Sequence, residues 1–329
     1  MNLSRRFVMS AASAAIALPA LGQARGVPAP SPRSDSGAIL GEGPLWSAHD
    51  NTLYWVDIRG KTLHAFSLDA KRPAGSDSWG GRSWAMPDLI NWIVLRQPKG
   101  ALAGSFLVGI LRTVYALTLE PFTLTALLTI EDDKTENRLN DAKVDAKGRL
   151  WTGTMHMPFT QKTAALYRID PDLSVHQMDA PYLCTNGPAF SPDGTRLYHN
   201  ETSEGLVYVF DLAADGGLSN KRIFTKFAPD VGLPDGETTD ADGGVWVAHY
   251  GGGRISRYTP DGTLDFDVMM PAKQVTSLTF AGEKLDRLFV TTAAQPPVGA
   301  DDPHAGTLFE VPKALLRGHV GLPINIFAG

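Results

Sequence analysis

Short hydrophobic segments that contain an aromatic residue recur along the chain, separated by polar stretches rich in turn-forming residues. Six segments share this character, and they cover residues 53–56, 106–108, 150–152, 197–199, 245–247 and 288–290. Their centres follow one another at intervals of 43 to 53 residues. A strand-and-turn repeat of roughly 40–50 residues is typical of a β-propeller. The spacing therefore predicts six blades around one channel.

Each repeat has the same internal order of turns and strands. A turn such as residues 191–194 (SPDG) precedes the hydrophobic segment, and a glycine-rich loop such as residues 251–253 can follow it. The next segment, as in residues 206–210 or 254–258, has the alternation of a strand with one side in a sheet core. Four such strands make a blade. We therefore expect an all-β fold, a six-bladed β-propeller of four-stranded antiparallel blades, that forms one domain over residues 38–329.

The first 24 residues have a different character. Arg5 and Arg6 precede an apolar stretch, and the small residues Gly22 and Ala24 suit cleavage by a signal peptidase. The adjacent arginines resemble a twin-arginine signal, with an ordinary secretory signal as the alternative. The apolar stretch is too short for a stable membrane span. We expect residues 1–24 to be an export signal, residues 25–37 to be a flexible leader, and the mature protein to be periplasmic or secreted.

Charge and cysteine content narrow the classes of function. The formal net charge is −5, and it would be −7 without the two arginines of residues 1–24. An acidic surface disfavours nucleic acid and anionic membranes as partners. The single cysteine, Cys184, excludes an internal disulfide and a CxxC motif.

Polar residues stand at one equivalent phase of four repeats, shortly before the hydrophobic segment. They are Glu42, Asn140, Asn186 and Asp235. Equivalent phase in a propeller means the same end of the channel, so we expect these side chains to converge although they are far apart in the sequence. Carboxylate and amide oxygens suit Ca²⁺, Mg²⁺ or Mn²⁺, and Zn²⁺ also accepts oxygen ligands. The pattern predicts one divalent metal ion in the channel, although each Asn-Gly or Asp-Gly pair taken alone is a common turn.

Four sequence motifs at these positions resemble the gluconolactonase–regucalcin (senescence marker protein) family. The motifs are GEGPLW with LYWVDI, NRLNDAKVDAKGRLWTGTM, TNGPAFSPDGTRLY and LPDGETTDADGGVWVA, in that order. Together they extend the resemblance over almost all of the chain that follows the leader.

The resemblance implies the residues of a site. Glu42, Asn186 and Asp235 would hold the metal, while Arg138 and Asn140 would bind substrate oxygens. Members of this family hydrolyse sugar lactones to aldonic acids, so a gluconolactone-like sugar lactone is the implied small-molecule partner. Asp235 would also be the catalytic base that takes a proton from the attacking water.

The chain departs from the family pattern at several positions, among them the strand ending at residues 199–201 (HNE), and other functions stay open. Ala142 stands where the family usually has glycine, and no acidic residue follows the GTM segment at residues 153–155. The alternatives are a metal-dependent aryl-ester or organophosphate hydrolase, or a non-catalytic propeller that binds a metal or a carbohydrate. The sequence also leaves open whether His156, Glu201 or His249 lines the pocket.

Overall fold

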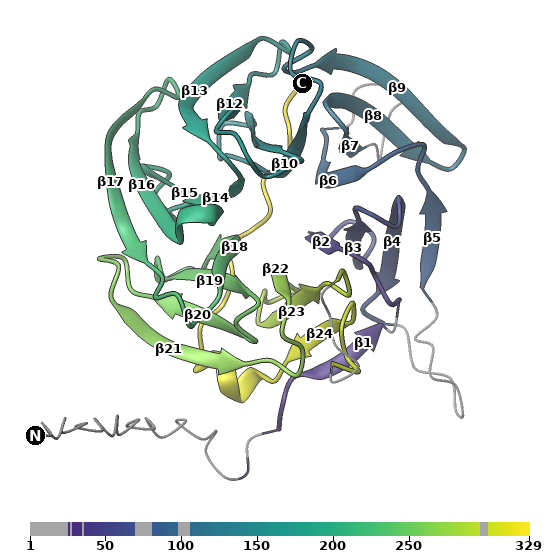
Figure 1. Cartoon of the computed structure of the whole chain (residues 1–329). Helices are drawn as coiled ribbons and strands as arrows, with labels where there is room; N and C mark the ends of the chain where they lie inside the picture. Colours follow the sequence, from purple (N-terminus) through teal and green to yellow (C-terminus); the bar gives the residue numbers. More distant parts are fainter. Residues whose placement is uncertain (1–25, 27, 35, 70–80, 98–105, 297–301) are drawn as a thin grey trace, which may run out of the picture.

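The computed structural model describes residues 26, 28–34, 36–69, 81–97, 106–296 and 302–329. Within these ranges, six four-stranded antiparallel sheets surround a central channel, which confirms the predicted six-bladed propeller (Figure 1). The predicted export signal, residues 1–24, lies outside the described residues. In the part of the chain that is described, no helix is long and apolar enough to cross a membrane.

Each blade extends from an innermost strand at the channel to an outermost strand at the rim. In that order, blade 1 contains β2 (Gly41–Ser47), β3 (Thr52–Asp57), β4 (Thr62–Ser67) and β5 (Arg82–Ala85), and blade 2 contains β6 (Ile90–Leu95), β7 (Phe106–Ile110), β8 (Thr113–Leu119) and β9 (Phe122–Thr129). Blade 3 contains β10 (Asn137–Val144), β11 (Leu150–His156), β12 (Ala164–Ile169) and β13 (Val175–Tyr182), and blade 4 contains β14 (Thr185–Phe190), β15 (Arg196–Glu201), β16 (Leu206–Leu212) and β17 (Leu218–Lys226). Blade 5 contains β18 (Leu233–Thr239), β19 (Val245–Tyr250), β20 (Arg254–Tyr258) and β21 (Leu264–Met269), and blade 6 contains β22 (Val275–Ala281), β23 (Arg287–Thr292), β24 (Leu308–Val311) and β1 (Ser31–Ser34). Two short 3₁₀ helices, η2 (Thr202–Glu204) and η3 (Lys313–Leu316), complete the described elements.

Each hydrophobic segment of the repeat forms the second strand of its blade. Every residue of β3 is buried, as expected for a sheet covered by blades on both sides. Trp151 of β11 is fully buried, and its indole N–H donates to Asp145, which also accepts backbone N–H groups of the preceding turn. Trp246 of β19 and Asp240 repeat this arrangement. The turn and the core tryptophan therefore form one structural unit.

The N-terminal strand closes the ring. β1 pairs antiparallel with β24, so the outermost strand of blade 6 comes from the opposite end of the chain. Ser31–Ser34 lie inside the segment, residues 25–37, that we expected to be a flexible leader. Backbone pairing with β24 makes these four residues part of blade 6, which moves the start of the propeller from residue 38 to Ser31.

The innermost strand of every blade is irregular at one point. The pairing with the second strand shifts register between Glu42 and Leu45, Ile90 and Trp92, Leu139 and Ala142, Asn186 and Ala189, Pro234 and Glu237, and Val275 and Ser277. A bulge bends the strand and redirects its side chains. The same device thus recurs at one level of the channel in all six blades.

The C-terminal segment, residues 318–329, crosses the channel, and we call it the C-terminal strap (Figure 1). The Gly321 N–H donates to the Leu285 carbonyl of blade 6, and the Asn325 side chain donates to the Val144 carbonyl of blade 3. Phe327 is fully buried among core residues of blades 2 and 3. The strap therefore joins blades from opposite sides of the ring.

Candidate metal and substrate site

The four polar residues at one phase of the repeats all lie at the bulges of inner strands. Glu42 belongs to β2, Asn140 to β10, Asn186 to β14 and Asp235 to β18, and all four are buried. Around the channel, β10 contacts β14 and β14 contacts β18, while β2 contacts the inner strands β6 and β22 on its two sides. Their bulges lie near the beginning of each strand, so the four side chains gather toward the same end of the channel, which we call the site end.

A chain of hydrogen bonds connects blades 3 and 4 at the site end. Arg138 donates from Nη1 to the Asn140 Oδ1 at 2.8 Å, and the Asn140 Nδ2 donates to the Asn186 Oδ1 at 2.8 Å. The Asn186 Nδ2 donates in turn to the Thr202 hydroxyl, which donates to the Pro234 carbonyl of β18. These bonds fix which amide atom is oxygen at each position, and they direct the Asn186 oxygen toward Asn140.

Asn91 of β6 belongs to the same network, and sequence analysis missed it. Its Oδ1 accepts a hydrogen bond from the Arg138 Nη1 at 3.0 Å, while its Nδ2 donates to the carbonyls of Gly109 and Leu111. The sequence around it, DLINW, has no glycine or proline turn signal. What identifies Asn91 as a site residue is its position at the inner-strand bulge of blade 2.

Buried carboxylates face one another in this region. The Glu42 carboxyl lies close enough to Asp235 to share a hydrogen bond, and burial together with the Asp141 charge raises the pKa of Glu42 to about 8. Burial and the neighbouring Glu42 and Asp141 charges raise the pKa of Asp235 well above its usual range. Burial likewise raises the pKa of Asp141 to about 6. Like charges and desolvation both favour the protonated forms of these carboxyls. A bound cation would therefore stabilise their ionised forms.

These residues fit a hard divalent ion. Glu42 and Asp235 are two carboxylates in contact, and a buried pair of this kind is stable only with a proton or a cation between its members. Asn186 adds a neutral oxygen that is already oriented by Asn140. Carboxylate and amide oxygens without imidazole or thiolate are the ligands preferred by Ca²⁺, Mg²⁺ and Mn²⁺.

Three further charged residues interact with this cluster, and sequence analysis did not assign them to the site. They are Asp141, Lys143 and Glu237. Lys143 of β10 donates from Nζ to the Glu237 carbonyl of β18. Its charge interacts with the Asp141 and Glu237 carboxylates. Glu237 is fully buried, and neither carboxylate oxygen has a hydrogen-bond partner among the described residues. Sequence analysis passed over Glu237 because it stands in an ordinary strand pattern two residues after Asp235.

Cys184 does not have the form of a nucleophile. It is buried with its Sγ 3.9 Å from the Asn140 Nδ2, and burial raises the pKa of its thiol to about 12. A thiol with this pKa stays protonated at neutral pH, whereas the thiolate is the reactive species.

The three residues left open by the sequence have structural partners. The ring of His249 pairs with the Val231 carbonyl and the Ser256 hydroxyl, and burial lowers its pKa to about 4. Glu201 accepts hydrogen bonds from the Leu183 N–H and from a neighbouring serine. The Nδ1 of His156 accepts N–H groups of the loop that follows it.

A second cluster of potential ligands, Asp240, Asp242 and His319, has a structural explanation. The Asp240 carboxylate accepts hydrogen bonds from the Trp246 indole, the Arg257 guanidinium and two backbone N–H groups. The same turn geometry recurs at Asp145, which lies in no such cluster within the described residues. Asp240 therefore stabilises a turn that recurs in the repeats of this chain. Asp242 and His319 form a partly exposed pair beside it.

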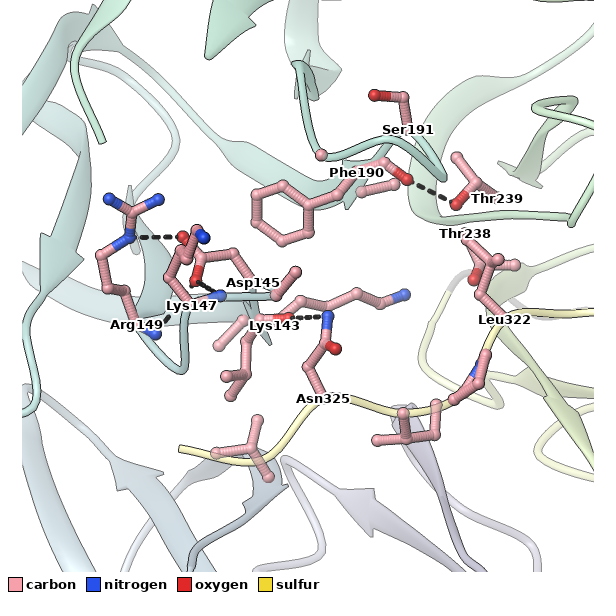
Figure 2. A pocket seen from close by; sticks show the side chains of 18 of the residues that line it. Lys143, Asp145, Lys147, Arg149, Phe190, Ser191, Thr238, Thr239, Leu322 and Asn325 are labelled. Carbon is pink, nitrogen blue, oxygen red and sulfur yellow. Dashed lines mark hydrogen bonds and ion pairs between the residues drawn. The ribbon is translucent and has the colours of Figure 1, made fainter. Parts of the chain in front are cut away.

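The remainder of the channel contains a cavity of about 530 Å³ (Figure 2). The second halves of the inner strands, the turns after β10 and β14, and residues 322–325 of the C-terminal strap line it. Glu42, Asn140, Asn186 and Asp235 do not line this cavity. Lys143 does, and Figure 2 draws it among the side chains that surround the cavity. The cavity and the site are neighbours, since Gly43 and Asp141, which adjoin Glu42 and Asn140 in the sequence, also line the cavity.

Comparisons with known proteins show which proteins this chain is similar to. The family model described as SMP-30/Gluconolactonase/LRE-like region matches residues 40–294. A protein named 6-deoxy-6-sulfogluconolactonase from Pseudomonas putida is 31% identical over 276 residues, which are 83% of this chain and 90% of that protein. The L-arabinolactonase of Azospirillum brasilense is 32% identical over 302 residues, which are 90% of this chain and 94% of that protein. The solved structure of a luciferin-regenerating enzyme superposes with a TM-score of 0.81 at 28% identity, covering 91% of this chain and 100% of that one.

Proposed function

This chain belongs to the SMP-30/gluconolactonase/LRE-like family, and from that premise we propose that it hydrolyses a sugar lactone to the aldonic acid with the help of one divalent metal ion. One observation carries the proposal. The buried carboxylates of Glu42 and Asp235 lie together at the site end of the channel, beside the hydrogen-bonded series Arg138, Asn140 and Asn186. Two similar proteins named as sugar lactonases support the substrate class.

Glu42, Asn186 and Asp235 would hold the ion. When bound, a divalent ion supplies a Lewis acid that polarises a lactone carbonyl and stabilises negative charge on its oxygen. The buried carboxylates supply two negative charges, and the neutral Asn186 adds an oxygen without further charge. This balance leaves the ion electron-poor, as Lewis-acid chemistry requires.

The side chains around the ion divide the remaining tasks. Asp235, kept ionised beside the ion, would accept a proton from the attacking water. Arg138 is held by Asn91 and Asn140 through Nη1, so its planar donors are fixed in direction and can bind lactone oxygens. Asn140 orients both Arg138 and Asn186.

Lactone hydrolysis by the purified protein tests the proposal. Proton release from D-glucono-1,5-lactone, xylonolactone and galactonolactone is followed after chelation and after adding back Ca²⁺, Mg²⁺, Mn²⁺ or Zn²⁺. We expect turnover above the spontaneous rate that depends on the added ion. Ion-independent hydrolysis, or hydrolysis of aryl esters or organophosphates in place of lactones, would contradict the assignment.

Asp235→Asn tests the role of the base. Removing a general base typically costs about 10²–10⁴-fold in rate, so we expect kcat to fall at least about a hundredfold. Because the variant removes one of two adjacent buried carboxylates, the metal-free protein should become more thermostable, not less. Glu283→Gln removes an exposed carboxylate and is the matched control. Full activity in Asp235→Asn would rule out this mechanism.

A further inference from the structure

The site end of the channel is bounded in part by blades 5 and 6. Blade 6 stands between the blades of Asp235 and Glu42, because β22 contacts β18 on one side and β2 on the other (Figure 1). Each second strand is antiparallel to an inner strand that begins at the site end, so β19 and β23 finish there. The last residue of β19 is Tyr250, which pairs with Leu233, two residues before Asp235. Tyr250 and the loop after β23 therefore lie at the mouth of the site, beyond the two carboxylates.

The ring of Tyr250 leans from blade 5 over blade 6. Side chains alternate along a strand, so Tyr250 shares one face of β19 with Trp246 and Ala248. Those two residues pack in a core cluster with β22 residues of blade 6. Tyr250 packs one step further along, against a cluster that comprises Ala293 and core residues of blades 1 and 2. The ring thus extends from blade 5 toward blade 1, and it stays partly exposed.

The Tyr250 hydroxyl has a proton to donate. Its oxygen accepts a hydrogen bond from the Nε2 of Gln295, three residues after β23, and its proton has no acceptor among the described residues. Burial raises the pKa of Tyr250, and the Asp235 charge adds to this effect, so the hydroxyl stays protonated at neutral pH. Tyrosine hydroxyls that are mostly buried usually find partners. A donor that is fixed by Gln295 and has no acceptor within the protein is therefore available to a ligand at the mouth.

We propose that Tyr250 is a substrate-binding residue whose hydroxyl donates a hydrogen bond to a ring hydroxyl of the sugar lactone, and that Gln295 is the positioning residue that orients it. This inference rests on the proposed function. With the lactone carbonyl at the ion held by Glu42, Asn186 and Asp235, the hydroxyl groups on the far side of the ring lie toward the mouth. Tyr250 thereby favours polyhydroxylated lactones over lactones without hydroxyl groups.

Two lactones of the same ring size test the role of Tyr250. D-Glucono-1,5-lactone has ring hydroxyls, whereas δ-valerolactone has none. Since a neutral hydrogen bond is lost, Tyr250→Phe should lower kcat/KM for gluconolactone roughly three- to tenfold, mainly through a higher KM. The same variant should leave kcat/KM for valerolactone unchanged. Tyr208→Phe, which alters a partly exposed tyrosine of blade 4, is the matched control and should leave both values unchanged. Equal losses on both lactones, or no loss on gluconolactone, would overturn the proposal.

Gln295→Leu provides a second variant and a double-mutant cycle. It should raise KM for gluconolactone in the wild-type background and have no further effect in Tyr250→Phe, because it acts through the phenol. Losses that simply add in the double variant would refute the positioning role of Gln295.

A binding measurement separates this inference from the proposed reaction. D-Glucono-1,5-lactam keeps the ring, carbonyl and hydroxyls of the lactone but resists hydrolysis. With Ca²⁺ bound, Tyr250→Phe should weaken its binding by the same factor, measured by calorimetry. Binding that depends on Tyr250 in a protein that hydrolyses no lactone would refute only the proposed reaction. A wild type that does not bind the lactam, or binds it no better than Tyr250→Phe, would overturn this inference.

Discussion

Glu42 shows how burial acts on a single carboxylate. Its pKa is raised to about 8 in the folded protein because desolvation and the Asp141 charge both oppose ionisation. In the unfolded chain the same group has an ordinary pKa near 4.5. Between these two pH values the metal-free folded protein keeps a proton that the unfolded chain releases. Stability must then fall with rising pH over this range, since the folded state binds more protons.

We therefore expect the free energy of unfolding of the metal-free protein to decrease between pH 5 and pH 8. Glu42→Gln should show a flatter dependence, because it cannot ionise. Saturating metal should remove or reverse the decrease, since binding requires the deprotonated carboxylate and stabilises only the folded state. Denaturant unfolding at several pH values, with and without chelator, measures these slopes. A metal-free wild type with the same pH slope as Glu42→Gln would contradict this account.

The residues of the site differ in how far their roles could be predicted from the sequence. Glu42, Asn186 and Asp235 each adjoin a glycine at the same phase of the repeat, so their convergence could be predicted. Asn91 has no adjoining glycine, and Glu237 follows Gly236 but otherwise looks like an ordinary strand residue two positions after Asp235. Their roles come from contacts with Arg138 and Lys143 in other strands, which no local pattern records.

At the scale of the element, the bulge of the inner strand decides where a site residue points. In β14 the bulge contains Gly187, whose φ is +77°, a conformation that favours glycine. A Cβ added there would lie 2.5 Å from the Glu237 Oε1. The glycine next to Asn186 is thus required both by its backbone conformation and by the close approach of the neighbouring blade.

Gly187→Ala should therefore cost more than the backbone conformation alone. Gly194 is a matched control because its φ is +68° and an added Cβ would meet nothing within 4 Å. Gly194→Ala should lose about 1–2 kcal/mol, the usual cost of a left-handed residue with a side chain. Gly187→Ala should lose clearly more and should also weaken calcium binding, because Asn186 moves with the bulge. Equal losses of stability in the two variants, measured by denaturant unfolding, would show that the contact with Glu237 has no effect.

The strands also differ in predictability. The second strand of each blade is buried on both faces and reads as a hydrophobic segment, so all six could be predicted. β1 has only four residues, Ser31–Ser34, none of them fully buried. Its structure depends on pairing with β24, nearly 280 residues away in the sequence. The local sequence of such a segment has no strand pattern and therefore predicts a loop.

At the scale of the whole molecule, one strand pairing and one terminal segment hold the ring of blades closed. β1 completes blade 6 by pairing with β24, and the C-terminal strap connects blade 6 to blades 2 and 3 across the channel (Figure 1). The strap has no strand periodicity, so the sequence did not predict it. It also forms one wall of the channel cavity, which places it at the end of the channel opposite to Glu42 and Asp235.

Two neighbouring residues of the strap, one buried and one exposed, allow the contribution of its buried anchor to stability to be measured. Phe327 is fully buried between blades 2 and 3, whereas Ile326 is 44% exposed. Replacing a buried phenylalanine by alanine typically costs about 3–5 kcal/mol, and an exposed substitution stays within about 0.5 kcal/mol. We expect Phe327→Ala and Ile326→Ala to differ by that much in denaturant unfolding, with calcium affinity kept in both because the proposed metal ligands lie at the other end of the channel. If Phe327→Ala also abolished calcium binding without unfolding the protein, the two ends of the channel would be coupled, and the strap would have to be considered part of the site.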